Sequence, residues 1–333
     1  MIEAYVAKRR GQTRLTVLDE SRYEELMADH VEPLLKRYRH QGFLTIVRGM
    51  RLNYEYYLNA DPVGAVVICH GMTESAEKYR EMTFYFLDAG YSVFALDLRG
   101  HGKSYREPKD HTLVHIGKFR DYVNDLHLFV QRIVRPNAVN QPLYLFAHSM
   151  GGAVGAMYLS KYPVVFRRAV LNAPMIAPCT NGMPLALVRP MAALFSLFGG
   201  RKKRVFTFGE FNEEEPFETA ASTSLARFDY YRQKRAQYRH LQTNAPTYGW
   251  LLQATGVTKT ILNKDACAMV QAPVLLLRAA TDCYVKPKPQ DTFISRIPHG
   301  ELVEIPESKH EIFLSENRVL QPYLDRILTF FAK

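Results

Sequence analysis

Residues 143–152 read Leu-Tyr-Leu-Phe-Ala-His-Ser-Met-Gly-Gly, an apolar run that passes directly into small residues around a serine. The first five residues predict a buried strand, and residues 151–161 predict a helix. A strand that turns sharply into a helix at a serine is typical of a nucleophile elbow, in which the hydroxyl stands above the edge of a sheet. The segment therefore indicates strands joined by helices, with a reactive serine at one sheet edge.

Ser149 is the predicted nucleophile, and its neighbours suit the turn. Gly151 and Gly152 permit the neighbouring strand to approach closely. Ala147 stands where the usual pattern has glycine, and its small side chain is compatible with the same turn. An ordinary helix N-cap serine is the alternative interpretation of Ser149.

The same strand–helix rhythm extends in both directions from this segment. Two amphipathic strands are predicted over 43–47 and 52–58. Buried strands are predicted for the apolar runs 65–69, 92–96, 143–147, 169–171, 274–277 and 302–305. Helices are predicted over 77–89, 119–134, 151–161, 289–297 and 317–331. This alternation predicts an α/β fold with a doubly wound, mostly parallel sheet.

The alternation of predicted strands and helices divides the chain into three parts. Residues 1–40 are predicted to be a polar, helical N-terminal extension, and residues 41–172 and 273–333 to be the core. Residues 173–272 interrupt the alternation with proline-rich turns, an apolar stretch and charged runs. An insertion between strands of an open sheet lies near their carboxyl ends, where ligands bind. We therefore expect residues 173–272 to be a helical cap over the site.

A serine nucleophile needs a base, and the base needs an orienting acid. In folds with this elbow the chain order is serine, acid, histidine. Asp282 follows the strand 274–277 and is the predicted acid, with a turn or N-cap aspartate as the alternative. Asp265 precedes that strand and Asp291 lies within the next predicted helix, so both are expected to be remote from Ser149.

The predicted base is His310, which follows the strand 302–305 and so lies at its carboxyl end. His299 precedes the same strand, which places it at the opposite edge of the sheet. Because the elbow also lies at the carboxyl end of its strand, only His310 is expected to reach the serine. A solvated loop histidine is the alternative interpretation of His310.

An oxyanion requires two positioned donors, one after the nucleophile and one from the loop after an earlier strand. We predict the N–H groups of Met150 and Met72, with a simple strand-ending turn as the alternative for the loop before Met72. The glycine-rich turn 97–104 is expected to shape the floor of the site, with a phosphate-binding loop as the alternative. The predicted supporting residues are His70, Gly71, His148, Gly151, Asp97 and His101.

Composition excludes several classes of protein. Of the 333 residues, 47% are hydrophobic and 23% charged, as in a globular protein with a full core. The four cysteines show neither a CxxC pair nor metal-ligand spacing. The predicted serine mechanism needs neither a metal nor an organic cofactor, and we predict none. The formal net charge of +10 suits either a basic soluble protein or one that meets anionic lipid or acidic substrates. No nucleic-acid-binding pattern accompanies the basic clusters, so no nucleic-acid partner is predicted.

Targeting signals are not evident in the sequence. The segment from Met1 to Gly11 is polar and basic and lacks the apolar region of a secretory signal. The most apolar stretch, from Pro184 to Phe198, is interrupted by Arg189 and Pro190 and is too short to span a bilayer. We expect a cytoplasmic protein, either soluble or peripheral on the cytoplasmic face of the inner membrane.

Residues 42–331 resemble the monoglyceride lipase and lysophospholipase group of α/β-hydrolases. The similarity rests on His-Gly-Met-Thr-Glu at 70–74 with Tyr79, Asp-x-Arg-Gly-His-Gly-x-Ser at 97–104, and Ala-His-Ser-Met-Gly-Gly at 147–152. The segments 115–126 and 172–175 add to it. The resemblance implies hydrolysis of one acyl ester on a glycerol or glycerophosphate backbone, with a lysophospholipid or another single-acyl lipid as substrate.

Other functions stay open from the sequence. A small-ester carboxylesterase or a proline-specific aminopeptidase would use the same three residues, and an inactive lipid-binding scaffold would use none. The aminopeptidase requires an acidic subsite, for which Glu213, Glu214 and Glu215 are candidates. Within the expected cap, Leu194, Phe195 and Phe198 are predicted to line an acyl channel. The basic residues 201–204 are predicted to contact an anionic membrane.

Overall fold

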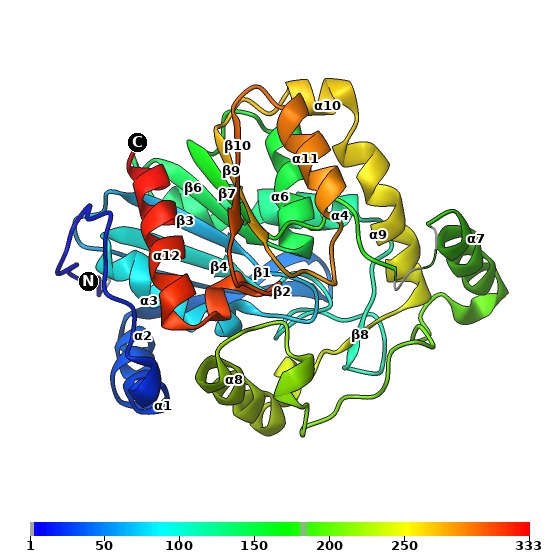
Figure 1. The fold of residues 1–333 in the computed structure, drawn as a ribbon, viewed down its shortest axis with the longest axis horizontal. Helices are drawn as coiled ribbons and strands as arrows, with labels where there is room; N and C mark the ends of the chain where they lie inside the picture. The colour runs from blue at the N-terminus through cyan, green and yellow to red at the C-terminus, as the bar shows by residue number, and fades with distance from the viewer. Residues whose placement is uncertain (1–2, 181–182, 184) are drawn as a thin grey trace.

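The central element of the protein is an eight-stranded sheet, seen edge-on at the middle of Figure 1. A computed structural model describes residues 3–180, 183 and 185–333, so Met1 and Pro184, named above, lie outside the described residues. The sheet order is β1-β2-β4-β3-β6-β7-β9-β10. The strands are β1 (Arg39–Val47), β2 (Met50–Tyr57), β3 (Gly64–Cys69), β4 (Tyr91–Leu96), β6 (Leu143–His148), β7 (Arg168–Asn172), β9 (Val274–Ala279) and β10 (Gly300–Ile305).

Strand direction separates one edge of the sheet from the rest. β1 pairs antiparallel with β2 and β2 with β4, whereas all later neighbours are parallel. A second, two-stranded sheet joins β5 (Leu113–Val114) to β8 (Ala245–Pro246). The carboxyl ends of β3, β6, β9 and β10 therefore meet at one edge, as the sequence predicted for the reactive side chains.

Helices cover both faces of the sheet (Figure 1). They are α1 (Tyr23–Leu26), α2 (Glu32–Tyr38), α3 (Arg80–Asp88), α4 (Arg120–Phe129), α5 (Arg135–Asn137), α6 (Met150–Lys161), α7 (Leu185–Phe195), α8 (Leu225–Gln237), α9 (Tyr248–Ile261), α10 (Lys264–Ala268), α11 (Pro287–Arg296) and α12 (Asn317–Ala332). A short π-helical turn, Ser196–Gly200, extends α7.

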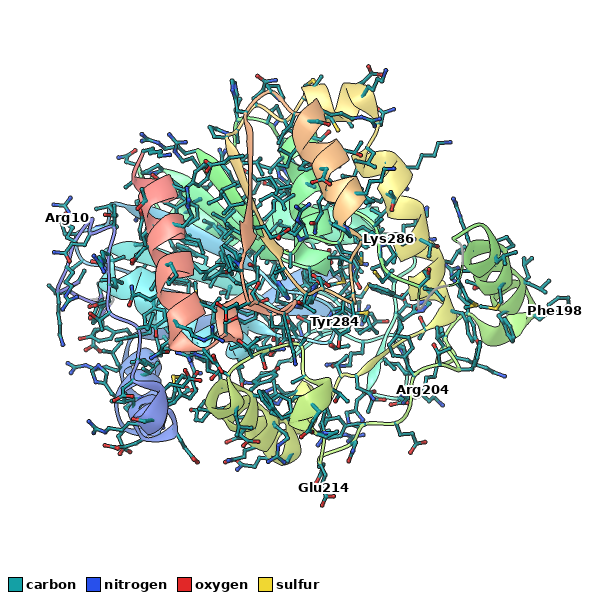
Figure 2. The ribbon with its side chains drawn as sticks, viewed as in Figure 1. Arg10, Phe198, Arg204, Glu214, Tyr284 and Lys286 are labelled. Atoms are coloured by element: carbon teal, nitrogen blue, oxygen red, sulfur yellow. The ribbon has the colours of Figure 1, made fainter. Side chains whose placement is uncertain are left out.

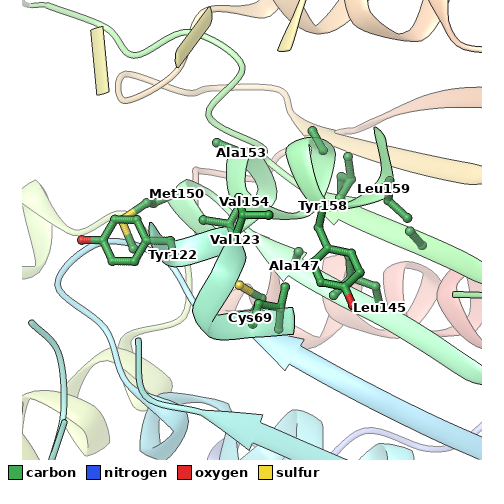
Figure 3. Close-up of a cluster of buried hydrophobic side chains, with 14 of the residues drawn as sticks. Cys69, Tyr122, Val123, Leu145, Ala147, Met150, Ala153, Val154, Tyr158 and Leu159 are labelled. Atoms are coloured by element: carbon green, nitrogen blue, oxygen red, sulfur yellow. The ribbon is translucent and has the colours of Figure 1, made fainter. Parts of the chain in front are cut away.

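The strand residues alternate between two buried clusters, one on each face. In β6, Leu145 and Ala147 belong to the cluster that includes α4 and α6, and Tyr144 and Phe146 to the cluster that includes α3 and α12. This is the period of two that a strand imposes on its side chains. Figure 3 shows Leu145 and Ala147 gathered with side chains of α6 and with Cys69 of β3. The apolar packing fixes β6 and α6 on either side of the elbow.

The N-terminal residues differ from the polar extension that their sequence predicts. Met27, Val31 and Leu35 are spaced like one helix face and are buried in the same cluster as α3 and α12. Leu15 and Val17, which precede the helices, are buried there too. The helical part begins only at Glu20, and the segment forms an outer layer of the core.

The segment between β7 and β9 has two different surroundings. α9 and α10 contact α6, and side chains such as Trp250, Val257 and Cys267 belong to the core cluster of that face. α8 instead lies across the carboxyl edge of the sheet (Figure 1). Its fully buried Arg227 donates to Glu81 of α3 with an Nη2–Oε1 distance of 2.8 Å, which ties α8 to the core.

Candidate active site

Ser149 lies in the strained turn between β6 and α6. Its φ is 52° and its ψ is −116°, a conformation that residues with a side chain rarely adopt. The turn leaves no room at Gly151, where a Cβ would lie 2.2 Å from the carbonyl oxygen of Cys69. A Cβ at Gly152 would lie 2.5 Å from the Cβ of Pro174. The small residues around the serine are therefore required by close backbone contacts.

Three side chains from distant parts of the chain meet at the carboxyl edge. The Oγ of Ser149 lies 2.8 Å from Nε2 of His310, and Nδ1 of His310 lies 2.7 Å from Oδ2 of Asp282. With its proton on Nδ1, the imidazole donates to Asp282 and accepts from the serine hydroxyl. His299 is at the other end of β10, where its carbonyl oxygen accepts from Val274 at the start of β9.

The carboxylate of Asp282 is stabilised in its charged form. Its Oδ1 accepts hydrogen bonds from the N–H groups of Tyr284 at 2.8 Å and Val285 at 3.1 Å. Burial alone raises the pKa of Asp282, but the hydrogen bond and charge of His310 and these two amides outweigh it and lower the pKa below its ordinary value. Asp282 is thus ionised at neutral pH and can hold the imidazole in one tautomer.

The amides of Met72 and Met150 are both available beside Ser149. Met150 is the first residue of α6, so its N–H has no acceptor within the helix. Met72 follows β3 and lines the same cavity as Ser149. Within the described residues its N–H donates to no acceptor. Two free amides near the nucleophile form an arrangement that can accept a developing oxyanion.

Glu74 holds the loop that carries Met72. Its Oε2 accepts from the N–H of Gly71 and from the hydroxyl of Tyr79, each at 2.6 Å. Its Oε1 lies 3.3 Å from Nζ of Lys78. In the sequence, Glu74 and Tyr79 stand out only as parts of a motif. The structural role of Glu74 depends on contacts that no spacing reveals.

Of the predicted supporting residues, His148 lines the cavity, whereas His70, Asp97 and His101 are buried and do not line it. Asp97 accepts from the N–H groups of Ala76 at 2.8 Å and Lys103 at 3.0 Å, and Nε2 of His70 accepts from the N–H of Leu98 at 2.9 Å. The rings of His70 and His101 pack edge to face with centroids 5.0 Å apart. These contacts join the loops after β3 and β4. No residue of the turn 97–104, all of which the structure describes, lines the cavity, so this turn supports the loop that carries Met72 and does not form the floor expected from the sequence.

A cavity of about 400 Å³ opens above Ser149 and His310. Its outer wall comes from the segment 208–244, with aromatic side chains of Phe208, Phe211 and Phe228. The prediction that Leu194, Phe195 and Phe198 line this space is wrong. Because α7 packs against α9, away from the carboxyl edge, these side chains are 55%, 45% and 83% exposed.

Comparisons with known proteins agree with this geometry. Residues 60–317 match the family model described as serine aminopeptidase, S33. Lysophospholipase L2 of Escherichia coli is 31% identical over 281 residues, which cover 80% of each chain. Human monoglyceride lipase is 29% identical over 121 residues, covering 34% of this chain and 36% of its own length.

A solved structure shows the same fold. A soluble variant of monoglyceride lipase from Saccharomyces cerevisiae superposes with a TM-score of 0.70 at 19% identity, covering 88% of this chain and 94% of its own. These likenesses confirm the predicted fold class and the resemblance drawn from the motifs.

Among the residues that the structure describes, no helix is both long and apolar enough to cross a bilayer.

Proposed function

This chain belongs to the serine aminopeptidase S33 family of α/β-hydrolases, and from that premise we propose that it cleaves the carboxylic ester of a single-acyl lipid. Its relatives include proteins named lysophospholipase and monoglyceride lipase, and this relationship identifies it as an ester hydrolase. The observation that carries the proposal is the position of His310, which contacts Ser149 and Asp282 at once.

The proposed reaction proceeds in two halves. His310 Nε2 takes the proton of Ser149 as the serine oxygen attacks the ester carbonyl, and the amides of Met72 and Met150 hold the resulting oxyanion. The intermediate collapses, His310 returns the proton to the departing alcohol, and an acyl-serine remains. A water molecule, deprotonated by His310, then releases the fatty acid and restores Ser149.

The aminopeptidase alternative finds less support. Glu213 and Glu214 do not line the cavity, and the carboxylate of Glu215 already pairs with Arg235 at 2.8 Å. An acidic subsite for a substrate amine would therefore rest on the second oxygen of Glu215 and on Glu210, which precedes it in the same loop and also lines the cavity. An ester substrate needs no such subsite.

The test is a comparison of substrates with a variant of the nucleophile. The protein should hydrolyse a lysophospholipid, and Ser149→Ala should abolish this activity and fluorophosphonate labelling, with a loss of roughly 10⁶-fold in kcat. Circular dichroism should be unchanged. Faster cleavage of a prolyl-peptide amide would favour the aminopeptidase, and an unlabelled, inactive parent protein would favour the lipid-binding scaffold.

We further propose that the end of α7 contacts an anionic membrane. Leu197 and Phe198 are 82% and 83% exposed, and Figure 2 shows Phe198 pointing away from the body of the protein. Lys202 and Arg204 are partly neutralised by Glu107 at 3.0 Å and Asp110 at 3.1 Å. Exposed Arg201 and Lys203 beside the apolar residues fit an anionic lipid surface.

A further inference from the structure

The outer wall of the cavity carries four charged side chains that the proposed reaction does not use. Arg232 and Arg235 lie one turn apart on α8, and Glu210 and Glu215 lie on the segment before it. All four line the same cavity as Ser149. Two cations and two anions give this wall a formal charge of zero, with both signs present.

The charged groups closer to Ser149 are already paired with one another. Nζ of the buried Lys78 contacts Glu311 and lies 3.3 Å from Glu74. Glu74 also accepts the two hydrogen bonds, from Gly71 and Tyr79, that hold the loop after β3. This inner cluster is therefore committed to the protein itself, and ligand charge has to be met by the outer wall.

The two arginines retain donors for a ligand. Arg235 donates through Nη1 to Glu215 at 2.8 Å, and its guanidinium lies 4.9 Å from the ring centroid of Phe211. Arg232 donates through Nε to Asp229 at 3.1 Å and through Nη1 to the carbonyl of Glu213 at 3.2 Å. In each case Nη2 has no acceptor among the described residues, and a guanidinium suits phosphate oxygens.

The acidic residues have capacity as well. Glu210 is exposed and forms no ion pair with the described residues, and Glu215 meets Arg235 through one oxygen. Their carboxylates can accept hydrogen bonds from a primary ammonium group, or attract a quaternary ammonium group by charge alone. A purely anionic ligand would be attracted by the arginines but repelled by these glutamates, and an uncharged glycerol would use neither pair.

We propose that this wall recognises a zwitterionic headgroup, with the phosphodiester at Arg232 and Arg235 and the ammonium group at Glu210 and Glu215. The inference rests on the proposed function and names its substrate class, a lysophospholipid with a phosphoethanolamine or phosphocholine headgroup. α8 presents the two arginines on the face that also carries Phe228 and Tyr231, at helical spacings of three and four residues. Arg227 anchors this helix to Glu81 of the core, so the wall is preorganised.

The experiment compares headgroups at a constant acyl chain. kcat/KM is measured in neutral detergent micelles for lysophosphatidylethanolamine, lysophosphatidylglycerol and monoacylglycerol, with a short soluble ester beside them. The parent protein should prefer the zwitterionic lipid over both others by tenfold or more. Arg232→Gln with Arg235→Gln should reduce its preference over monoacylglycerol at least tenfold, mainly through KM. Arg239→Gln, an exposed arginine outside the cavity, should leave that preference intact.

The reverse change provides a second arm. Glu210→Gln with Glu215→Gln removes both carboxylates of the wall, so that Arg235 loses its partner and Arg232 keeps only Asp229. The preference should then shift from the zwitterionic lipid toward lysophosphatidylglycerol. Equal rates of the parent on all three lipids, or equal losses of the arginine variant on all three, would overturn the headgroup proposal alone. A parent protein that cleaves only the short ester would overturn the proposed lipid function, and the headgroup proposal with it.

Discussion

The imidazole of His148 lies beside that of His310, with ring centroids 4.9 Å apart. Only His310 contacts Ser149 and Asp282. Burial, followed by the charge of His310, lowers the pKa of His148 well below its ordinary value. His148 also lies 2.8 Å, through Nδ1, from the side-chain amide of Asn172. It is thus a neutral structural neighbour of the base and does not compete for the serine proton.

The buried histidines predict how the free energy of unfolding depends on pH. His70 and His101 are buried and have lowered pKa values like His148, so all three stay neutral in the folded protein. Below the ordinary histidine value of about 6.5, the unfolded chain binds protons that the folded one does not, so the free energy of unfolding should fall as the pH drops. The loss should approach about 1.4 kcal/mol per pH unit for each histidine.

Denaturant unfolding between pH 7 and pH 5 measures this slope. His148→Gln should reduce this slope by the contribution of one histidine, because one proton fewer is taken up on unfolding. His299→Gln, a change at an exposed position, should not alter the slope. An identical slope in His148→Gln and the parent protein would contradict the assignment.

Asp282→Asn should retain the fold and lose activity. The asparagine cannot stabilise the imidazolium that forms when His310 takes the serine proton, and a loss of about 10⁴-fold in kcat is expected. The pKa of Asp282 is lowered in the folded protein, so its carboxylate contributes fully to the free energy of unfolding above the ordinary aspartate pKa of about 3.9. This contribution is lost as the pH falls through the lowered pKa. Near-parental turnover by Asp282→Asn across pH 5 to 9 would argue against its role.

Glu74→Gln should affect the chemical step more than binding. The change weakens the hydrogen bond from the Gly71 N–H and so displaces the neighbouring Met72 N–H from the oxyanion. Loss of one oxyanion donor costs about 10²-fold in kcat. KM should change little. Glu311→Gln, which also removes a carboxylate from Lys78 but does not touch the Gly71 amide, is the matched control. Steady-state kinetics on a short ester measures both, and comparable losses would assign Glu74 to general support of the cluster.

The membrane proposal predicts separable apolar and ionic contributions. Leu197→Ser with Phe198→Ser should reduce sedimentation with vesicles at every salt concentration, because burial of apolar side chains is not screened. Arg201→Gln with Lys203→Gln should weaken it at low salt by about 1 kcal/mol per residue. Turnover of a short soluble ester should stay near the parental rate in both. Arg48→Gln, at an exposed turn between β1 and β2, is the control; equal sedimentation of all variants would refute the proposal.

The sequence by itself determined the sheet and the order of the reactive residues. Buried strands of parallel sheets are continuous apolar runs, and the small residues after β6 are required by the contact between Gly151 and Cys69. Since carboxyl ends of parallel strands meet at one edge, the positions of Ser149, Asp282 and His310 along the chain were enough to predict that they converge. These signals are local, because each strand is indicated by its own apolar run.

Only the tertiary structure decided what covers that edge. Between β7 and β9 the apolar periodicity is the same for a helix that packs on the core and for one that covers a cavity, so sequence alone misplaced Leu194, Phe195 and Phe198. Their position follows from the packing of α7 on α9, while the salt bridge from Arg227 to Glu81 brings α8 over Ser149. The salt bridge joins residues 146 positions apart, and the free energy of both contacts depends on the assembled fold rather than on any local pattern.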